Sequence, residues 1–353
     1  MGKGQAAVTP SHGEAAVLGK PLHTPAAWTA PEALAHPHEW QLVLTPEHVE
    51  ELLRATQTAV ATNKAVPELT TADFPLPSLG PKLREIRDSV LTERGFYLLR
   101  GFPVEQLTRQ EVVTAWYGIG LYWGVARSQN AKGHVVGHVK NLDDDVNADD
   151  VRVYTTNAAQ ASTVEAIAPW HVDDADLVGL LCLKTAKQGG LSGWASSISI
   201  YNKLLETRPD LVQELAKIYA FDKKGELAPG TKPFLTVPVL SFYKGRLTFF
   251  YNDKYIKDAQ KFPDVPRLTE KQLEALQAVT DLANSPDLHL EWDLQVGDVQ
   301  LIYNWTQLHM RTAYIDQEGF DNRRHLLRLW ISVPGANPID PHRGRLSAPL
   351  EAE

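Results

Sequence analysis

The sequence has a single cysteine, Cys182, among its 353 residues. One cysteine cannot form a disulfide framework or a thiolate zinc cluster, so both are excluded. Because Cys182 lies in the apolar run LVGLLCL, it is expected to be a buried small hydrophobic residue. A reducing compartment is compatible with this composition.

Long hydrophobic runs and an excess of positive charge are also missing. No apolar stretch reaches the roughly 18 residues of a membrane span, and the N-terminal segment lacks the hydrophobic centre of a secretory signal. The 43 acidic residues outnumber the 35 basic ones, which argues against binding to nucleic acid or to an anionic membrane surface. We therefore expect a cytoplasmic protein that acts on a small molecule.

The chain has 43% hydrophobic residues, enough to build a large core. Residues 1–40 are rich in Ala, Pro, Gly and His and have no sustained periodicity, which predicts an extended or partly disordered N-terminal arm. Residues 41–353 are expected to form a single domain with helical insertions. No internal repeat is visible, so solenoids and propellers are excluded.

Several segments carry helix-start signals. Thr45 precedes a Pro and an amphipathic run, Thr108 and Glu111 form a capping box, and Thr269 and Gln272 form another. Residues 200–219 are expected to form one further helix.

Strand patterns dominate the rest of the chain. A short strand is expected within 95–103, a buried strand at 177–183, a hairpin across Lys244-Gly245 and a similar hairpin around Gly297. This pattern favours a mainly β fold with flanking helices (α+β), an antiparallel sandwich or barrel rather than a doubly wound sheet.

A histidine followed two residues later by an acidic residue is expected to occur by chance in this composition. Twelve histidines and 43 acids predict one or two such pairs by chance, and four occur. The pairs begin at His12, His48, His171 and His289. The first lies in the unpatterned arm. The second lies in a predicted helix, where residues i and i+2 point in opposite directions.

The pairs at His171 and His289 remain, because side chains i and i+2 of a strand leave the same face. Two histidines and one carboxylate on iron(II) leave positions open for a bidentate cosubstrate and for dioxygen. The best candidate for the third ligand of His171 and Asp173 is His309, which follows an apolar strand.

Two arginines share one face of a later strand. The segment RRHLLRLWIS places Arg324, Leu326, Arg328 and Trp330 on one side and His325, Leu327, Leu329 and Ile331 on the other. A buried guanidinium needs an anionic partner, and a dicarboxylic cosubstrate supplies one that Arg binds bidentately.

Five motifs in this order, WHVDDADLVGLLCL, GGLSGWASS, RPDLVQEL, LHMRTAYIDQ and RRHLLRLWIS, resemble the iron(II)/2-oxoglutarate dioxygenases of the taurine dioxygenase and clavaminate synthase type. The resemblance covers the chain from about residue 90 onward. It implies a double-stranded β-helix, a distorted jelly roll. It also implies Fe(2+), 2-oxoglutarate and O2, and the oxidation of an unactivated C–H bond coupled to the formation of succinate and CO2.

By position, the resemblance makes His171, Asp173 and His309 the metal ligands and leaves His289 as a structural residue. Arg324 would bind the distal carboxylate of 2-oxoglutarate, and Ser192 would donate its hydroxyl to the same group. Halogenating relatives replace the metal carboxylate by a small residue, so the presence of Asp173 argues against halogenation.

The substrate is expected to be a small amino acid or a related carboxylate, oxidised by hydroxylation, desaturation or cyclisation. Arg328 matches a second family arginine that binds either an acidic group of the substrate or the cosubstrate, and both options stay open. Tyr154, Asn157 and Gln160 precede the metal motif where relatives place substrate contacts.

Other interpretations are weaker. A zinc-dependent hydrolase with the same triad would give Arg324 and Ser192 no role, and a non-catalytic jelly-roll binding protein would give none to the triad. The remaining metal candidates are expected to be loop or strand residues: Asp174 and Asp176, His134 and His138.

Overall fold

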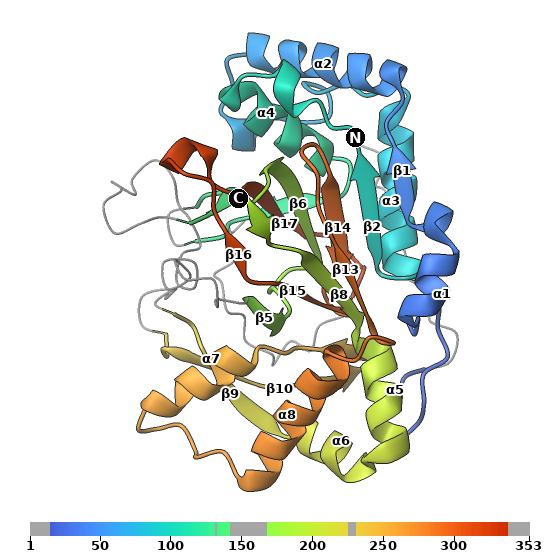
Figure 1. Cartoon of the computed structure of the whole chain (residues 1–353), viewed down its shortest axis with the longest axis vertical. Helices are drawn as coiled ribbons and strands as arrows, with labels where there is room; N and C mark the ends of the chain where they lie inside the picture. Colours follow the sequence, from blue (N-terminus) through green and yellow to red (C-terminus); the bar gives the residue numbers. More distant parts are fainter. Residues whose placement is uncertain (1–14, 131–132, 142–167, 225–230, 338–353) are drawn as a thin grey trace.

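The computed structural model describes residues 15–130, 133–141, 168–224 and 231–337 (Figure 1). The substrate-contact candidates Tyr154, Asn157 and Gln160 lie outside these residues. Within the described residues, no helix is both long and apolar enough to cross a membrane.

A large sheet forms the centre of the molecule (Figure 1). Its strand order is β1-β2-β14-β6-β17-β3, with β4 also paired to β17. All neighbours are antiparallel except β1 and β2. The strands are β1 Gln41–Val43, β2 Phe96–Arg100, β3 Val125–Arg127, β4 Val136–Lys140, β6 Leu177–Lys184, β14 Val299–Tyr303 and β17 His325–Ser332.

A smaller antiparallel sheet, in the order β13-β8-β15-β5, faces the large one. Its strands are β5 Ala168–His171, β8 Ser192–Ser196, β13 His289–Trp292 and β15 Gln307–Arg311. Trp194 and Leu290 of this sheet share a core cluster with Ile302 and Leu326 of the large sheet. The fold is therefore a double-layered jelly roll with its core between the sheets, which confirms the expected fold class.

Three two-stranded ribbons complete the β structure. They are β7 Gln188–Gly189 with β16 Tyr314–Ile315, β9 Ile218–Asp222 with β10 Phe234–Pro238, and β11 Leu240–Tyr243 with β12 Arg246–Phe249.

Helices cover both ends and one side of this β core (Figure 1). Helix α3 packs on β2 and β14, α4 packs on β17, and α5 packs on β8 and β15. The predicted capping residues Thr45, Thr108 and Thr269 accept hydrogen bonds at the starts of α2, α4 and α8. The helices are α1 Ala30–Ala35, α2 Pro46–Ala61, α3 Leu79–Thr92, α4 Arg109–Gly120, α5 Ser197–Thr207, α6 Pro209–Leu215, α7 Asp253–Asp258 and α8 Glu270–Ala283.

One of the two predicted hairpins is present. Lys244 and Gly245 both have positive φ and connect β11 to β12, as a tight two-residue turn requires. The hairpin predicted around Gly297 is wrong, because β13 pairs with β8 in the small sheet whereas β14 pairs with β2 and β6 in the large one. Gly297, at φ 83°, instead lies where the chain passes from one sheet to the other.

The single helix predicted over 200–219 is also wrong. It is two helices, α5 and α6, which are separated at Arg208, and residues 218 and 219 already belong to β9. Arg208 adopts φ −144° and ψ 63°, because the ring of Pro209 disfavours helical geometry in the residue before it.

The described part of the N-terminal arm packs against the core. Trp28 and Trp40 are buried, and Trp40 stacks edge-on against Trp194 of the small sheet. The indole N–H of Trp28 donates to the carbonyl of Arg94, and that of Trp40 to the carbonyl of Ala33. The division between an arm and a single domain at residue 40 stays a prediction.

Candidate metal centre

Three side chains from the small sheet converge on one point between the layers. His171 is the last residue of β5, Asp173 follows it by two residues, and His309 lies in β15 directly opposite His171. Cross-strand partners lie about 5 Å apart, which brings the two imidazole rings to 4.2 Å between centroids. One ligand atom from each residue of this triad lies within 4.8 Å of the others.

Each histidine of the triad offers one nitrogen to this point. The Nδ1 of His171 donates to the carbonyl of Pro169 at 2.7 Å, which leaves Nε2 with its lone pair, 4.0 Å from Asp173 Oδ1. The Nε2 of His309 lies 3.8 Å from Asp173 Oδ2. Burial lowers the pKa of His309 to about 3, with His171 adding to the effect, so the ring is neutral and can act as a ligand.

Asp173 is buried and held by donors from the large sheet. The indole Nε1 of Trp330 donates to Oδ2 at 2.8 Å, and Arg328 Nη1 lies 3.2 Å from the same oxygen. Burial alone would raise the pKa of Asp173, but the Arg328 guanidinium and the hydrogen bond from Trp330 oppose it, and the pKa stays below its ordinary range. The carboxylate is therefore ionised.

A buried glutamine fixes Arg328 in turn. Gln129 Oε1 accepts from Arg328 Nε at 2.8 Å, while its Nε2 donates to the carbonyls of Arg328 and Val135. Gln129 has no solvent-exposed surface. A chain of contacts thus runs from Gln129 through Arg328 to Asp173.

The triad has the chemistry of an iron(II) site. Two neutral imidazoles and one ionised carboxylate are the donor set of the facial triad in non-haem iron oxygenases, and that set leaves room for further ligands. The contacts from Pro169, Trp330 and Arg328 are of the kind that orient metal ligands. His171, Asp173 and His309 could therefore hold the metal.

A second feature of the interior is the Arg324 guanidinium, which is buried. Its Nη2 donates to the carbonyl of Gly190 at 3.2 Å, and its backbone N–H donates to Asp316 Oδ1. Among the described residues, no carboxylate lies within ion-pair distance of this guanidinium. Burial lowers the pKa of Arg324, but an arginine stays protonated, so the site calls for an anion.

Gly190 contacts this guanidinium, and Ser192 follows it by two residues. Gly190 has φ 77°, and a Cβ there would lie 2.9 Å from Arg324 Nε, so only glycine fits. Ser192 is buried and pairs with Arg311 of β15, which places both side chains on the face that carries His309. A dicarboxylate such as 2-oxoglutarate fits a site with a metal and a buried guanidinium.

Comparison with known proteins shows which family the chain belongs to. Residues 58–330 match the family described as taurine catabolism dioxygenase TauD, TfdA family. The chain belongs to the TauD/TfdA dioxygenase family. It is therefore an iron(II)- and 2-oxoglutarate-dependent dioxygenase, and its cofactors are Fe(2+), 2-oxoglutarate and O2.

Two relatives align over most of this dioxygenase. FR-33289 synthase of Streptomyces rubellomurinus is 30% identical over 326 residues, which are 90% of this chain and 92% of the relative. The taurine hydroxylase-like protein SAT17 of Stachybotrys chartarum is 34% identical over 270 residues, 74% of this chain and 67% of the relative.

Solved structures share the fold at low sequence identity. An asparagine oxygenase in complex with Fe(II), 2S,3S-3-hydroxyasparagine and succinate has a TM-score of 0.61 at 16% identity and covers 83% of this chain and 94% of its own. The non-heme iron oxygenase OrfP with Fe, succinate and (3S)-hydroxy-L-Arg has a TM-score of 0.58 at 15% identity and covers 83% and 94%.

Other sequence candidates lie apart from the triad of this dioxygenase. Within the described residues, the triad is the one group of three or more His, Cys, Asp or Glu with metal-ligand geometry. His138 contacts His325 at 2.9 Å, and His289 donates to the carbonyl of Ser285. Asp176 accepts from the Trp305 indole and from the backbone of Val333.

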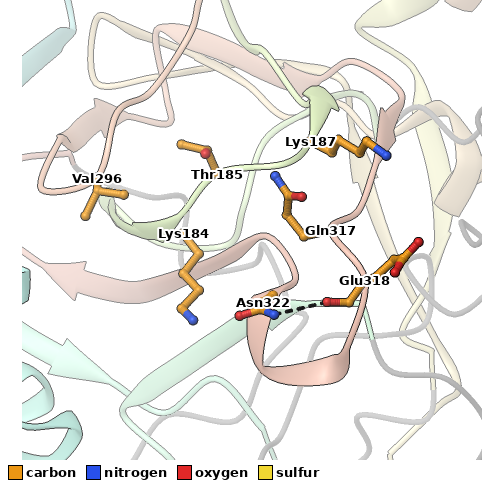
Figure 2. Close-up of a pocket in the computed structure, with 7 residues that line it drawn as sticks. All are labelled: Lys184, Thr185, Lys187, Val296, Gln317, Glu318 and Asn322. Atoms are coloured by element: carbon orange, nitrogen blue, oxygen red, sulfur yellow. Dashed lines mark hydrogen bonds between the residues drawn. The ribbon is translucent and has the colours of Figure 1, made fainter.

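A cavity of about 550 Å³ lies elsewhere on the molecule, between the end of β6 and the β16–β17 connection (Figure 2). No triad residue lines it. Asn322 closes one side by donating to the carbonyl of Glu318. Apart from Val296, the lining is polar: Lys184, Thr185, Lys187, Gln317, Glu318 and Asn322.

The sequence pattern missed three of the groups around the triad. Gln129 reaches Arg328 from 199 residues away, and the Asn304 side chain accepts from the backbone of Asp173 across 131 residues. Trp330 shares the predicted interior face with Arg328, so strand alternation carried a signal for it. Gln129 and Asn304 reach their partners only through the tertiary fold, so no local sequence pattern indicates them.

Proposed function

We propose that this dioxygenase oxidises an unactivated C–H bond of a small amino acid or a related small carboxylate. The proposal takes His171, Asp173 and His309 as the iron ligands. The observation that carries it is the convergence of the triad beside the Arg328 guanidinium. Because Arg328 contacts Asp173, a substrate carboxylate that pairs with Arg328 would be held next to the metal.

The cosubstrate site is proposed to contain Arg324 and Ser192. Arg324 supplies a buried charge for the distal carboxylate of 2-oxoglutarate, and the Ser192 hydroxyl lies on the same interior face as His309. When bound, iron and 2-oxoglutarate activate O2, so that one oxygen atom enters succinate, CO2 leaves and the other atom is available to the substrate.

The residues of this chain perform the supporting steps. His171 keeps its Nε2 directed inward through the Pro169 bond, and Asp173 stays ionised beside Arg328. The burial of Arg324 and His309 excludes bulk water from the two ends of the site.

The ligands bound in the solved structures support the substrate class. The asparagine oxygenase is in complex with hydroxyasparagine, and OrfP is in complex with L-Arg or with hydroxylated arginine. The comparisons give no support to a zinc-dependent hydrolase or a non-catalytic binding protein. Tyr154, Asn157 and Gln160 stay predicted substrate contacts.

A cytoplasmic location is part of the proposal, because iron(II) and 2-oxoglutarate are both available in that reducing compartment. The partner is expected to be a small molecule rather than a nucleic acid or a membrane, in keeping with the net charge of −8.

A mass-spectrometric panel tests the proposed substrate class. The purified protein with iron(II), ascorbate and 2-oxoglutarate is offered the common amino acids and small carboxylates, and both succinate and substrate mass are followed. We expect at least one compound to change by about +16 mass units, or by about −2 for desaturation or ring closure, with matching succinate. The His171→Ala variant is the control. Substrate-coupled turnover confined to compounds without a carboxylate would overturn the proposal.

A further inference from the structure

A second arginine, Arg311, lies on the interior face next to the cosubstrate site. It follows His309 by two residues on β15, so the two side chains leave the same face of the strand. In the register of the small sheet, Arg311 lies directly opposite Ser192. Partners in such a pair have Cβ atoms about 5 Å apart. Arg311 therefore borders the position proposed for the distal carboxylate.

One aromatic ring contacts both guanidinium groups. The Cζ of Arg311 lies 4.4 Å from the ring centroid of Tyr314, and the Cζ of Arg324 lies 5.5 Å from the same centroid. The guanidiniums of Arg311 and Arg324 therefore lie near each other, because both contact the same ring. Tyr314 is buried and begins β16, where it pairs with Gly189 next to the Gly190 carbonyl that binds Arg324.

Arg311 and Arg324 bring two positive charges together in a poorly hydrated part of the interior. Arg311 is partly buried and Arg324 is buried. Arg311 Nη1 donates to the carbonyl of Thr312, and Asp316 Oδ1 accepts from the backbone N–H of Arg324. Like charges held together in a partly buried site are stabilised by an anion between or beside them.

We propose that Arg311 is a second binding residue for the distal carboxylate of 2-oxoglutarate, acting together with Arg324 beside Tyr314. The Ser192 hydroxyl opposite Arg311 completes this group. Two guanidiniums can offer parallel N–H donors to a single carboxylate and discriminate strongly against an uncharged end. The inference rests on the proposed cosubstrate role of Arg324.

A pair of 2-oxo acids separates this role from a structural one. 2-Oxovalerate carries the same chelating end as 2-oxoglutarate but has a methyl group in place of the distal carboxylate. Binding of each is measured by calorimetry on the full chain with iron(II), without oxygen and without substrate. The variants are Arg311→Gln and Arg311→Lys, and the control is Arg323→Gln, whose arginine bonds the Asn141 carbonyl instead.

For Arg311→Gln we expect 2-oxoglutarate to bind about 10-fold more weakly or worse, while 2-oxovalerate changes less than about 2-fold. Arg311→Lys keeps the positive charge but not the bidentate guanidinium, so its affinity for 2-oxoglutarate should lie between those of the wild type and Arg311→Gln. Arg323→Gln should leave both affinities unchanged.

Equal losses for the two acids would overturn the assignment, because they would make Arg311 a structural residue of β15. Unchanged 2-oxoglutarate affinity would overturn it as well. If the wild type bound no 2-oxoglutarate in the presence of iron(II), the cosubstrate site itself would be wrong, an outcome distinct from either of these.

Discussion

The indole of Trp330 allows a direct test of how Asp173, the proposed carboxylate ligand of the metal, is held. Its Nε1 donates to Asp173 Oδ2 at 2.8 Å, and the side chain is almost completely buried. Trp330→Phe keeps an aromatic ring but removes this donor. Without it, the Asp173 carboxylate is free to rotate, and it must be ordered again when the metal binds.

The expected size follows from the contact. A hydrogen bond to a charged acceptor contributes about 1.5–3 kcal/mol, and each 1.4 kcal/mol is about a factor of ten in affinity. Arg328 Nη1, 3.2 Å from the same oxygen, still restricts the rotation of the Asp173 carboxylate in this variant. We therefore expect iron(II) to bind about 10-fold more weakly, within the roughly 10- to 100-fold range of residues that orient metal ligands.

The assay is an anaerobic iron(II) titration, alongside an unfolding curve for each protein. The matched control is Trp123→Phe, because Trp123 is also buried but its indole nitrogen has no hydrogen-bond partner among the described residues. Both variants lose the same volume. If the two lost metal affinity equally, or if Trp330→Phe kept wild-type affinity, the Trp330 bond would not position Asp173.

Two further predictions address the cosubstrate site and the edge of the large sheet. Gly190→Ala should weaken 2-oxoglutarate binding in the same calorimetric experiment, because the added Cβ meets Arg324 Nε at 2.9 Å; an unchanged affinity would contradict the placement of Arg324. Burial lowers the pKa of His325 to about 3, below its ordinary 6.5, so the unfolded chain takes up a proton first as the pH falls and the folded state loses stability below about pH 6.5. His325→Gln should therefore lose about 1.4 kcal/mol less unfolding free energy than the wild type between pH 6 and pH 5, measured by urea unfolding. The exposed His36→Gln should behave as the wild type, and equal pH dependence in all three proteins would argue against a buried neutral His325.

Sequence patterns a few residues long predicted those parts of the site whose residues lie close together in the sequence. The alternation of side chains along a strand kept the pair at His171 as a candidate, together with the pair at His289, although β5 ends at His171 and Asp173 lies just beyond it. Alternation also predicted the inward face of β17, where Arg328 and Trp330 contact Asp173. The helix caps and the Lys244-Gly245 turn were predictable for the same reason, since their signals are a few residues long.

Features that depend on contacts between residues far apart in the sequence could not be predicted from such short patterns. Alternation tells which face a residue occupies but not which strand is its neighbour, so the segments on either side of Gly297 looked like a hairpin although they belong to different sheets. For the same reason no sequence pattern indicates that Gln129 holds Arg328, or that Arg311 faces Ser192. The break before Pro209 did have a local signal.

The central claim is that His171, Asp173 and His309 bind iron(II) and that the metal and Arg324 together bind 2-oxoglutarate. It is tested most directly by an anaerobic titration in which the visible charge-transfer absorption of the iron–2-oxoglutarate chelate is followed. We expect one iron and one 2-oxoglutarate per chain in the wild type, and no such absorption in His171→Ala, which should still fold. Wild-type protein without this absorption, or a His171→Ala variant that develops it equally, would contradict the account.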